Sequence, residues 1–357
     1  MRTINPSLFK DKKILITGHT GFKGSWLTLW LTKLGAQVIG VSLNSGHEKG
    51  IFNSSKIKKD VIDIRGDIRD YALLESIFKK YNPDIIFHLA AQPLVKYSYQ
   101  HPQYTYDVNV MGTLNVLEAM RVNGSAQTAI FVTSDKCYEN KEWTWGYREN
   151  DPMGGIDPYS SSKGCCELLI SSYRDSYFST QEFQNHQTVI ATVRAGNVIG
   201  GGDWSLDRII PDTVNYLKED KDIIVRLPHA VRPWQHVLEA LSGYIILTAN
   251  LLQKNVKYSG SWNFGPYSKD MISVKELVEL FIQIWGSGRW REENISNAVH
   301  EAQFLSLDIS KANRQLHWFP KWDIYESIEK TVEWYKQYET SSIQELCHKQ
   351  INEYCNL

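Results

Sequence analysis

Short apolar runs alternate with longer amphipathic stretches through the first half of the chain. Six runs predict buried strands, at residues 13–17, 37–43, 61–64, 84–91, 128–133 and 189–193. Stretches between them carry bulky apolar residues at helical spacing, over residues 25–34, 71–81 and 105–123. Strands that alternate with helices form a parallel sheet covered on both faces. The sequence therefore predicts an α/β fold built on a doubly wound parallel sheet.

A glycine-rich turn follows the first predicted strand directly. Gly18, Gly21 and Gly24 stand at intervals of three residues between that strand and the helix over residues 25–34. In a dinucleotide-binding βαβ unit, the first glycine permits the tight turn and the second lets the backbone approach a pyrophosphate. The third lets the helix pack closely on the sheet. The N–H groups at the start of that helix face the phosphates. This turn predicts a bound dinucleotide and an NAD(P)-binding Rossmann domain.

The position that commonly distinguishes NAD from NADP follows the second predicted strand. An acidic residue is expected about there, to bind the ribose hydroxyls of NAD. This chain has Asn44, with His47 and Lys49 close by. A carboxamide still bonds a ribose hydroxyl, but it does not repel the extra phosphate of NADP. This position therefore leaves the choice between the two cofactors open.

Tyr159 and Lys163 are four residues apart, which places them on one face of a helix. An ammonium near a phenol lowers its pKa from about 10. The pair therefore predicts a phenolate base that removes a proton from an alcohol, assisted by the hydroxyl of Ser134. Asp135 and Lys136 add a second acid–base pair that a simple alcohol dehydrogenase does not need. These five candidate catalytic residues predict an oxidation combined with a further proton transfer.

The pattern changes after residue 193, where a glycine cluster at 200–202 is followed by scattered Trp and Arg residues. We predict a Rossmann domain of residues 1–193 with about 234–260. A smaller, interleaved C-terminal α/β domain is predicted for residues 194–233 with about 261–357. The aromatic and basic content of the second domain suits an organic anion with sugar and base parts.

The composition argues against several classes of partner. The chain has 39 basic and 40 acidic residues, which gives no support for binding nucleic acid or a membrane surface. No apolar run is long enough to span a bilayer. The five cysteines show no paired metal-ligand spacing and are typical of free thiols in a reducing compartment. We expect a cytoplasmic protein without a bound metal.

Longer segments resemble the nucleotide-sugar branch of the extended short-chain dehydrogenase/reductase family. The resemblance covers nearly the whole chain, from Ile14 to Trp322. The segments that carry it are residues 17–26, 90–95, 133–138, 145–150, 194–204 and 232–237. Within the branch, Asp135 followed by Lys136 resembles the dehydratases that act on CDP-glucose. The related dTDP-glucose dehydratases have Asp then Glu there, and the epimerases normally lack the pair.

The resemblance implies an internal redox cycle on CDP-glucose with NAD as the bound cofactor, in deoxysugar and lipopolysaccharide biosynthesis. Tyr159 would take the proton of the 4-hydroxyl, and hydride would pass to NAD⁺. Asp135 would then protonate the leaving C6 hydroxyl. Lys136 would be the C5 base, a cation that stabilises the enolate, or an ion-pair partner of a nearby acid, and the sequence leaves these three open. Return of the hydride to C6 and reprotonation of C5 would give CDP-4-keto-6-deoxyglucose.

Further site residues follow from the same resemblance. The expected cofactor contacts are Gly18, Gly21, Phe22, Lys23, Gly24, Asn44, Asp67, Ile68, Leu89, Ala90, Ala91, Tyr159 and Lys163. The expected substrate contacts are Gln92, Asn197, Arg208 and Arg232, of which the arginines suit a diphosphate. A homodimer through helices flanking Thr105 and Tyr159 is expected, or a homotetramer of two such dimers. Three alternatives remain, namely another nucleotide-sugar 4,6-dehydratase, a nucleotide-sugar 4-epimerase or reductase, and a non-catalytic NAD-binding regulator.

Overall fold

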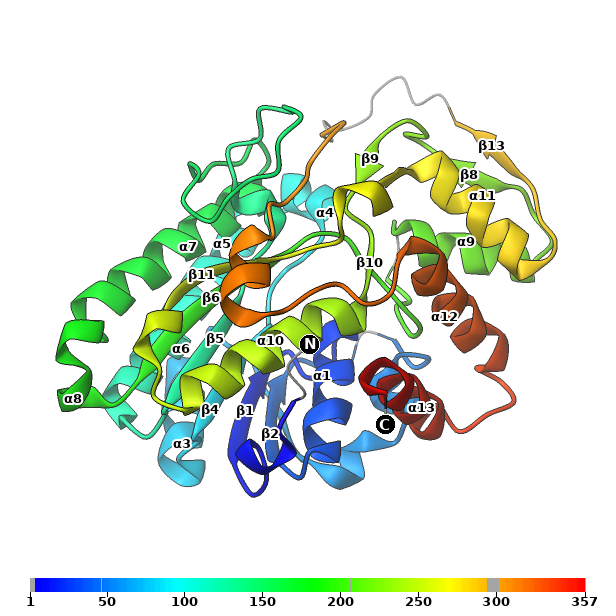
Figure 1. The fold of residues 1–357 in the computed structure, drawn as a ribbon. Coiled ribbons are helices and arrows are strands. Elements are labelled where there is room, and N and C mark those ends of the chain that lie inside the picture. The colour runs from blue at the N-terminus through cyan, green and yellow to red at the C-terminus, as the bar shows by residue number, and fades with distance from the viewer. Residues whose placement is uncertain (1–3, 46, 206, 294–301, 357) are drawn as a thin grey trace.

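A seven-stranded sheet in the order β11-β6-β5-β4-β1-β2-β3 forms the centre of the molecule, and all its strands are parallel (Figure 1). The structure is a computed structural model that describes residues 4–45, 47–205, 207–293 and 302–356. The strands are β1 (Lys13–Thr17), β2 (Gln37–Ser42), β3 (Ile62–Arg65), β4 (Ile85–His88), β5 (Thr128–Val132), β6 (Val189–Ala195) and β11 (Gly260–Phe264). The predicted doubly wound parallel sheet is confirmed.

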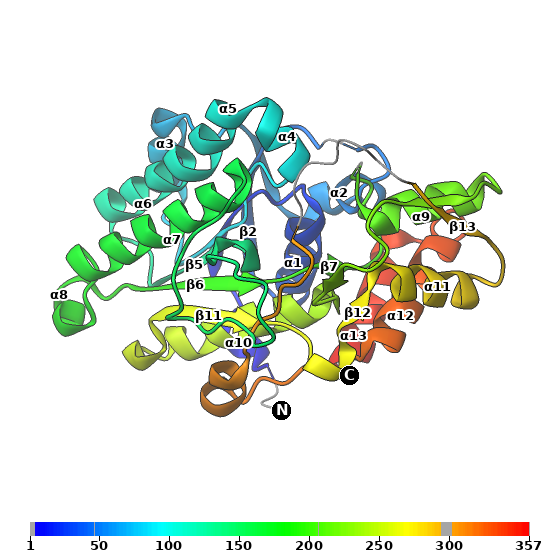
Figure 2. The same ribbon diagram turned by 90° about the horizontal axis from the view of Figure 1, so that it is seen from above.

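Helices cover both faces of this sheet, and each face has its own apolar core (Figure 2). One face carries α3 (Tyr71–Tyr81), α6 (Gly112–Asn123) and α7 (Pro158–Ser176), and the other carries α1 (Phe22–Lys33) and α10 (Val237–Leu252). Side chains of β1 alternate between the two cores, as a pleated strand requires. Leu15 lies in the first core, and Ile14 and Ile16 lie in the second.

The helix predicted over residues 105–123 is divided in the structure. It consists of α5 (Pro102–Tyr106), a π-helical turn (Asp107–Met111) and α6. Asn109 in the π turn is buried, and its carboxamide donates to Ser162 Oγ at 2.8 Å and accepts from the Gln92 backbone N–H at 2.8 Å. These contacts come from segments far away in the sequence, and they occupy the turn where the helix departs from regular spacing. Such turns are common at functional sites.

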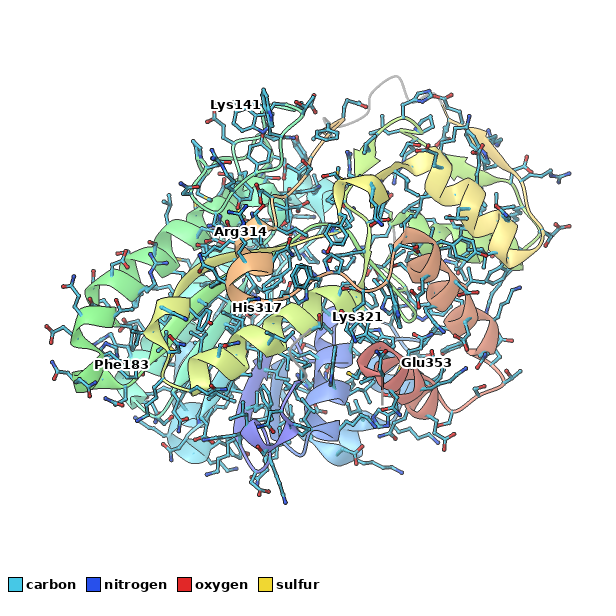
Figure 3. The ribbon with its side chains drawn as sticks, in the orientation of Figure 1. Lys141, Phe183, Arg314, His317, Lys321 and Glu353 are labelled. Carbon is cyan, nitrogen blue, oxygen red and sulfur yellow. The ribbon has the colours of Figure 1, made fainter. Side chains whose placement is uncertain are left out.

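α10 is buried along its length, and every residue from 237 to 251 is enclosed. Glu239 on this helix accepts backbone N–H groups of Lys321 and Trp322, at 3.0 and 2.8 Å, from the segment that runs over α10 (Figure 3). The Tyr354 hydroxyl donates to its other carboxylate oxygen at 2.8 Å. Tyr354 belongs to the C-terminal helix α13 (Ile343–Cys355), which packs beside α1. Glu239 therefore joins three distant segments inside the core.

A second group of elements lies to one side of the carboxyl ends of the strands (Figures 1 and 2). Its helices are α9 (Ile209–Lys218), α11 (Val274–Trp285) and α12 (Ile324–Gln337). Its strands form three pairs, namely β7 (Val198–Ile199) with β10 (Gln235–His236), β8 (Ile223–Val225) with β13 (Trp290–Glu292), and β9 (Val231–Arg232) with β12 (Ile272–Ser273). The remaining α-helices are short, namely α2 (Ile51–Ser54), α4 (Val95–Gln100) and α8 (Phe183–His186).

The sheet extends past the domain boundary that the sequence suggested near residue 260. β11 is its edge strand beside β6, and α13 returns to pack on α1. The interleaved division into two domains stays a prediction. Within the described ranges, no helix is both long and apolar enough to cross a membrane. Across the same residues, no three His, Cys, Asp or Glu side chains gather in a way that could hold a metal ion.

Candidate active site

The glycine turn between β1 and α1 packs closely against neighbouring backbone. Gly18 has φ of +77°, and a Cβ there would lie 2.8 Å from the backbone nitrogen of Ala90. A Cβ on Gly24 would lie 2.1 Å from Gly18 O, so only glycine lets α1 pack on this turn. Gly21 is the N-cap residue of α1, and no side chain caps the helix. The uncapped N–H groups and the positive end of the helix dipole fit a phosphate.

The end of β4 is tied to the same turn by a buried hydrogen-bond chain. Thr17 Oγ1 accepts the backbone N–H groups of Leu89 and Ala90, both at 3.2 Å, and bonds His88 Nδ1 at 2.7 Å. Burial lowers the pKa of His88 to about 3, so this imidazole is neutral. Leu89, Ala90 and Ala91 are only half-buried and lie at the carboxyl edge of the sheet, where doubly wound folds bind their ligands.

The residues expected around the adenosine half of a cofactor differ in how free their side chains are. Asn44 is exposed just past β2. The Asp67 carboxylate is paired with Arg69 at 2.7 Å, and hydrogen bonds from that guanidinium lower its pKa. The Ile68 side chain is buried against Gly112. The Ile68 side chain is therefore enclosed, its backbone oxygen accepts from Asn115 Nδ2 at 3.1 Å, and the adenine contact predicted there remains a prediction.

The structure brings Ser134, Tyr159 and Lys163 together at the end of β5. Tyr159 and Lys163 lie on α7, whose first turn is capped by the Asp157 side chain at the Ser160 N–H, 2.9 Å away. The Lys163 Nζ donates to the carbonyl oxygen of Val132 at 3.3 Å. Tyr159 and Lys163 are 9% and 6% exposed, so the pair faces an enclosed site rather than bulk solvent.

The phenol of Tyr159 does not have the lowered pKa that the spacing predicts. Burial raises its pKa to about 12, and the nearby Ser134 hydroxyl offsets only part of that rise. The prediction is wrong for the chain alone, because four-residue spacing says nothing about desolvation, which favours the neutral phenol. Lys163 is also enclosed, and burial lowers the pKa of its ammonium group. A further positive charge at this site would be needed to ionise the phenol near neutral pH.

Asp135 lies beside this group, on a short helical turn after β5. The Ser134 hydroxyl donates to its Oδ1 at 3.0 Å and also accepts the Lys136 N–H at 3.2 Å. Burial raises the pKa of Asp135, which is 3% exposed, while Lys136, Lys23 and Arg232 work in the opposite direction. A carboxyl that keeps its proton to higher pH than usual is suited to act as a general acid.

Lys23 extends from the start of α1 toward the same carboxyl. Burial lowers the pKa of its ammonium to about 8, and the charge of Asp135 partly restores it. Arg208 and Lys163 are close enough to lower it further. The sequence placed Lys23 among the cofactor contacts, and the structure adds that its charge faces the Asp135 side of the site.

The four predicted substrate residues differ in their present partners. Arg208 forms an ion pair with Asp203 at 2.9 Å. Arg232 donates to Val231 O and lies close enough to Asp135 to lower its pKa. The Gln92 carboxamide is bonded to Thr105 Oγ1 at 2.9 Å and to the Leu94 backbone, so its side chain is committed within the protein. Asn197 is half-buried and accepts the Gln235 N–H through its backbone oxygen.

A buried ion pair beneath the site was not predicted from the sequence. Arg194 on β6 donates two hydrogen bonds to the Glu167 carboxylate, at 2.9 and 2.8 Å, and a third to the Tyr138 hydroxyl at 2.6 Å. Glu167 also accepts from Thr133, the residue before Ser134. Glu167 follows Lys163 by four residues on α7, and this repeated spacing was the one available signal. The pair fixes the strand end that carries Ser134.

Comparison with known proteins places this arrangement in a family. The sequence profile described as GDP-mannose 4,6 dehydratase matches residues 15–331. A CDP-glucose 4,6-dehydratase of Salmonella typhimurium is 45% identical, with 98% of each chain covered. A UDP-glucuronate 4-epimerase of Thermodesulfobacterium geofontis is 27% identical over 90% of this chain and 96% of that protein.

Solved structures show the same fold. A dTDP-glucose 4,6-dehydratase of Streptomyces venezuelae with NAD bound has a TM-score of 0.78 and 22% identity, covering 91% of this chain and 97% of that one. A Thermus thermophilus UDP-glucose 4-epimerase in complex with NAD also has a TM-score of 0.78, at 23% identity, covering 91% and 99%. The architecture is thus shared with these NAD-bound dehydratase and epimerase structures. By sequence, the chain belongs to the GDP-mannose 4,6 dehydratase family.

Proposed function

We propose that this protein is an NAD-dependent hydro-lyase that converts CDP-glucose to CDP-4-keto-6-deoxyglucose. The observation that carries the proposal is the contact between the oxidation and elimination residues. Ser134 lies beside the Tyr159 phenol and donates to the Asp135 carboxyl at 3.0 Å. An epimerase needs only the Tyr/Lys pair. The 45% identity to the Salmonella CDP-glucose 4,6-dehydratase supports the choice of substrate and base.

The residues around the glycine turn fit a dinucleotide. Gly18 and Gly24 leave no room for side chains, the start of α1 offers uncapped N–H groups, and Leu89 to Ala91 form a half-buried edge beside the turn. These residues would hold NAD, with Lys163 and Tyr159 toward its nicotinamide half. When bound, NAD⁺ supplies temporary storage for the hydride that leaves C4 and returns to C6, so a cofactor held through each cycle suffices.

Different residues of the chain carry out the separate proton transfers of the reaction. Tyr159 removes the proton of the 4-hydroxyl, and Ser134 hydrogen-bonds the same oxygen. The resulting 4-ketone acidifies the C5 proton, which allows elimination of the C6 hydroxyl. Asp135, with its raised pKa, donates the proton to that leaving group. Lys136 lies next to Asp135 and serves as the C5 base or as the cation that stabilises the enolate.

Cationic side chains around Asp135 suit the diphosphate of the substrate. Arg208 and Arg232 carry forked guanidinium groups that match phosphate oxygens. Both act on the electrostatics of the catalytic residues, Arg208 on Tyr159 and Arg232 on Asp135. A bound diphosphate would compete with Asp203 for Arg208, so this ion pair is expected to open when the substrate binds. Asn197 and Gln92 remain candidate substrate contacts.

The proposal also includes an assembly and a compartment. Met111 and Leu168 expose 46% and 64% of their area beside the Thr105 and Tyr159 helices, which supports a homodimer through this surface or a tetramer of two dimers. All five cysteines are free thiols, which supports a reducing cytoplasm. Light scattering of the purified protein, compared with a Leu168→Lys variant, tests the dimer.

The test of the reaction is mass spectrometry of CDP-glucose incubated with the protein, with and without added NAD⁺. Parallel samples contain dTDP-, UDP- and GDP-sugars. Loss of one water from the CDP sugar alone, without net formation of NADH, is the expected result. An unchanged mass with a new 4-epimer would identify an epimerase instead. No reaction with any sugar despite bound cofactor would identify a non-catalytic NAD-binding regulator.

A further inference from the structure

The two oxygens of the Asp135 carboxyl have different surroundings. Oδ1 accepts the Ser134 hydroxyl at 3.0 Å. Oδ2 is buried and has no hydrogen-bond partner among the residues that the structure describes. The backbone of Gly196 passes close to it, because a Cβ there would lie 3.2 Å from Oδ2. A buried acceptor without a partner loses the hydrogen bonds that water gives it in the unfolded chain, and this loss destabilises the fold, more so if the acceptor is charged. Oδ2 is therefore expected to bind a donor that the protein chain does not itself supply.

A second buried polar atom without a partner is on α10. Tyr244 is fully buried, and its hydroxyl makes no hydrogen bond within the described ranges. Its ring packs edge-on against Phe264, with 5.7 Å between the ring centres. The Asp135 carboxylate is near enough to add to the effect of burial in raising the pKa of this phenol. The Tyr244 hydroxyl thus lies within electrostatic reach of the Asp135 carboxylate, and no hydrogen bond joins the two side chains.

A third such atom is the carbonyl oxygen of the Gln235 side chain. Gln235 is 2% exposed, and its Oε1 also lacks a partner in the described part of the chain. Its Nε2 donates to Phe264 O at 2.9 Å, on the residue whose ring contacts Tyr244. Its backbone N–H bonds Asn197 O at 3.0 Å, one residue beyond Gly196. Gln235 is therefore anchored between the surroundings of Tyr244 and those of Asp135.

These three atoms are a donor and two acceptors, which one water molecule satisfies. A water has two protons to give to Asp135 Oδ2 and Gln235 Oε1, and a lone pair to accept the Tyr244 hydroxyl proton. Buried waters in proteins typically make two to four such bonds. We propose that one buried water joins Tyr244 and Gln235 to the back of the Asp135 carboxyl, and that Tyr244 is a positioning residue for this acid. The role of Asp135 as the acid rests on the proposed function.

This water would orient the carboxyl and set its acidity. With Oδ2 bonded to this water, the carboxyl plane is fixed and Oδ1 stays on the side of Ser134 and Tyr159. Donation to Oδ2 stabilises the carboxylate, so removal of the Tyr244 hydroxyl weakens that stabilisation and raises the pKa of Asp135 further. The other titratable groups that face Asp135 are Lys136, Lys23, Arg232, Tyr159 and Cys137. None of them is altered in the test.

The test compares wild type with Tyr244→Phe, which removes one hydroxyl from the packed ring. The Asp135 carboxyl is titrated by infrared difference spectroscopy, with Asp135→Asn to assign its band. We expect the pKa of Asp135 in Tyr244→Phe to rise by about half a unit to one unit, and the alkaline limb of kcat/KM for CDP-glucose to move in parallel. Gln235→Met, which removes another ligand of the water, should move both in the same direction.

The control is Tyr258→Phe, which deletes a part-buried hydroxyl bonded to Gln315 O and should leave both titrations unchanged. A crystal structure of the wild type should show a water within about 2.7–3.2 Å of all three atoms. An unshifted carboxyl titration in both test variants, or no water at this position, overturns the inference. The infrared titration needs no substrate. An enzyme that leaves CDP-glucose unchanged while its Asp135 pKa shifts would therefore refute the proposed function and not this inference.

Discussion

The hydroxyl of Ser134 donates to the Asp135 carboxyl at 3.0 Å and lies beside the Tyr159 phenol, so a single side chain contacts both the base and the acid of the site. Oxidation at C4 and elimination across C5 and C6 involve three consecutive carbons of one sugar, and their proton-transfer groups must therefore lie close together. The structure achieves this with two elements, the strand end at Ser134 and the first turns of α7. The two half-reactions should be separable by mutating one group at a time.

Asp135→Asn should stop the reaction after oxidation. The carboxamide still accepts the Ser134 hydroxyl proton but does not donate an acidic proton to the leaving C6 hydroxyl. We expect dehydration to slow by about 10²–10⁴-fold, while oxidation at C4 continues. The absorbance of reduced nicotinamide should then rise when CDP-glucose is added. A variant that dehydrates at the wild-type rate would remove Asp135 from the mechanism.

Tyr159→Phe should block the reaction before that point. The phenyl ring fills the same enclosed space, so the fold and the affinity for NAD should change little. Because no base remains for the 4-hydroxyl proton, turnover should fall by at least about 100-fold, and no reduced nicotinamide should accumulate. Calorimetric titration with NAD⁺ supplies the control. Full activity in this variant would contradict the assignment of the base.

The spacing of residues along the chain predicted the parts of the site that depend on local structure. Gly18 and Gly24 are required by one turn, and Tyr159 and Lys163 share one helix, so both groups follow from the sequence alone. The raised pKa of Tyr159 and the buried Glu167–Arg194 pair do not. They depend on how α7 packs against β6, and the spacing of residues within either segment does not predict that contact.

The division of the helix predicted over residues 105–123 has a similar cause. Gln92 and Ser162, from other segments, bond Asn109 inside the π turn. The apolar spacing of the segment is that of an ordinary helix and gives no sign of these contacts. Tertiary hydrogen bonds therefore decide the local geometry here, and the helical pattern sets only its general class.

Gly21→Ala should separate cofactor binding from folding. Gly21 has φ of −74°, and a Cβ there would meet only Gly18 O, at 3.4 Å, so the chain itself has room for it. Stability should change by no more than about 1 kcal/mol. The same Cβ would obstruct a pyrophosphate at the start of α1, and NAD affinity should fall by about tenfold or more. Gly24→Ala, whose Cβ would lie 2.1 Å from Gly18 O, should instead lose stability and binding together.

Glu239 should make the stability of the fold depend on pH. Burial raises its pKa from 4.5 to about 7, and three hydrogen bonds oppose that rise only in part. An acid with a raised pKa binds more protons in the folded state, so its contribution to stability falls as pH rises from about 4.5 and levels off above about 7. A shift of this size corresponds to a loss on the order of 3 kcal/mol over that range.

The matched comparison is Glu239→Gln, which keeps an oxygen for the Lys321 and Trp322 N–H groups and does not titrate. Urea unfolding at pH 5, 6, 7 and 8 gives the free energy of unfolding for each protein. The free energy of unfolding of the wild type, relative to that of the variant, should fall from pH 5 to 7 and level off from 7 to 8. Because all other groups titrate alike in the two proteins, a constant difference over the whole range would show that Glu239 is ionised throughout, contrary to its buried position.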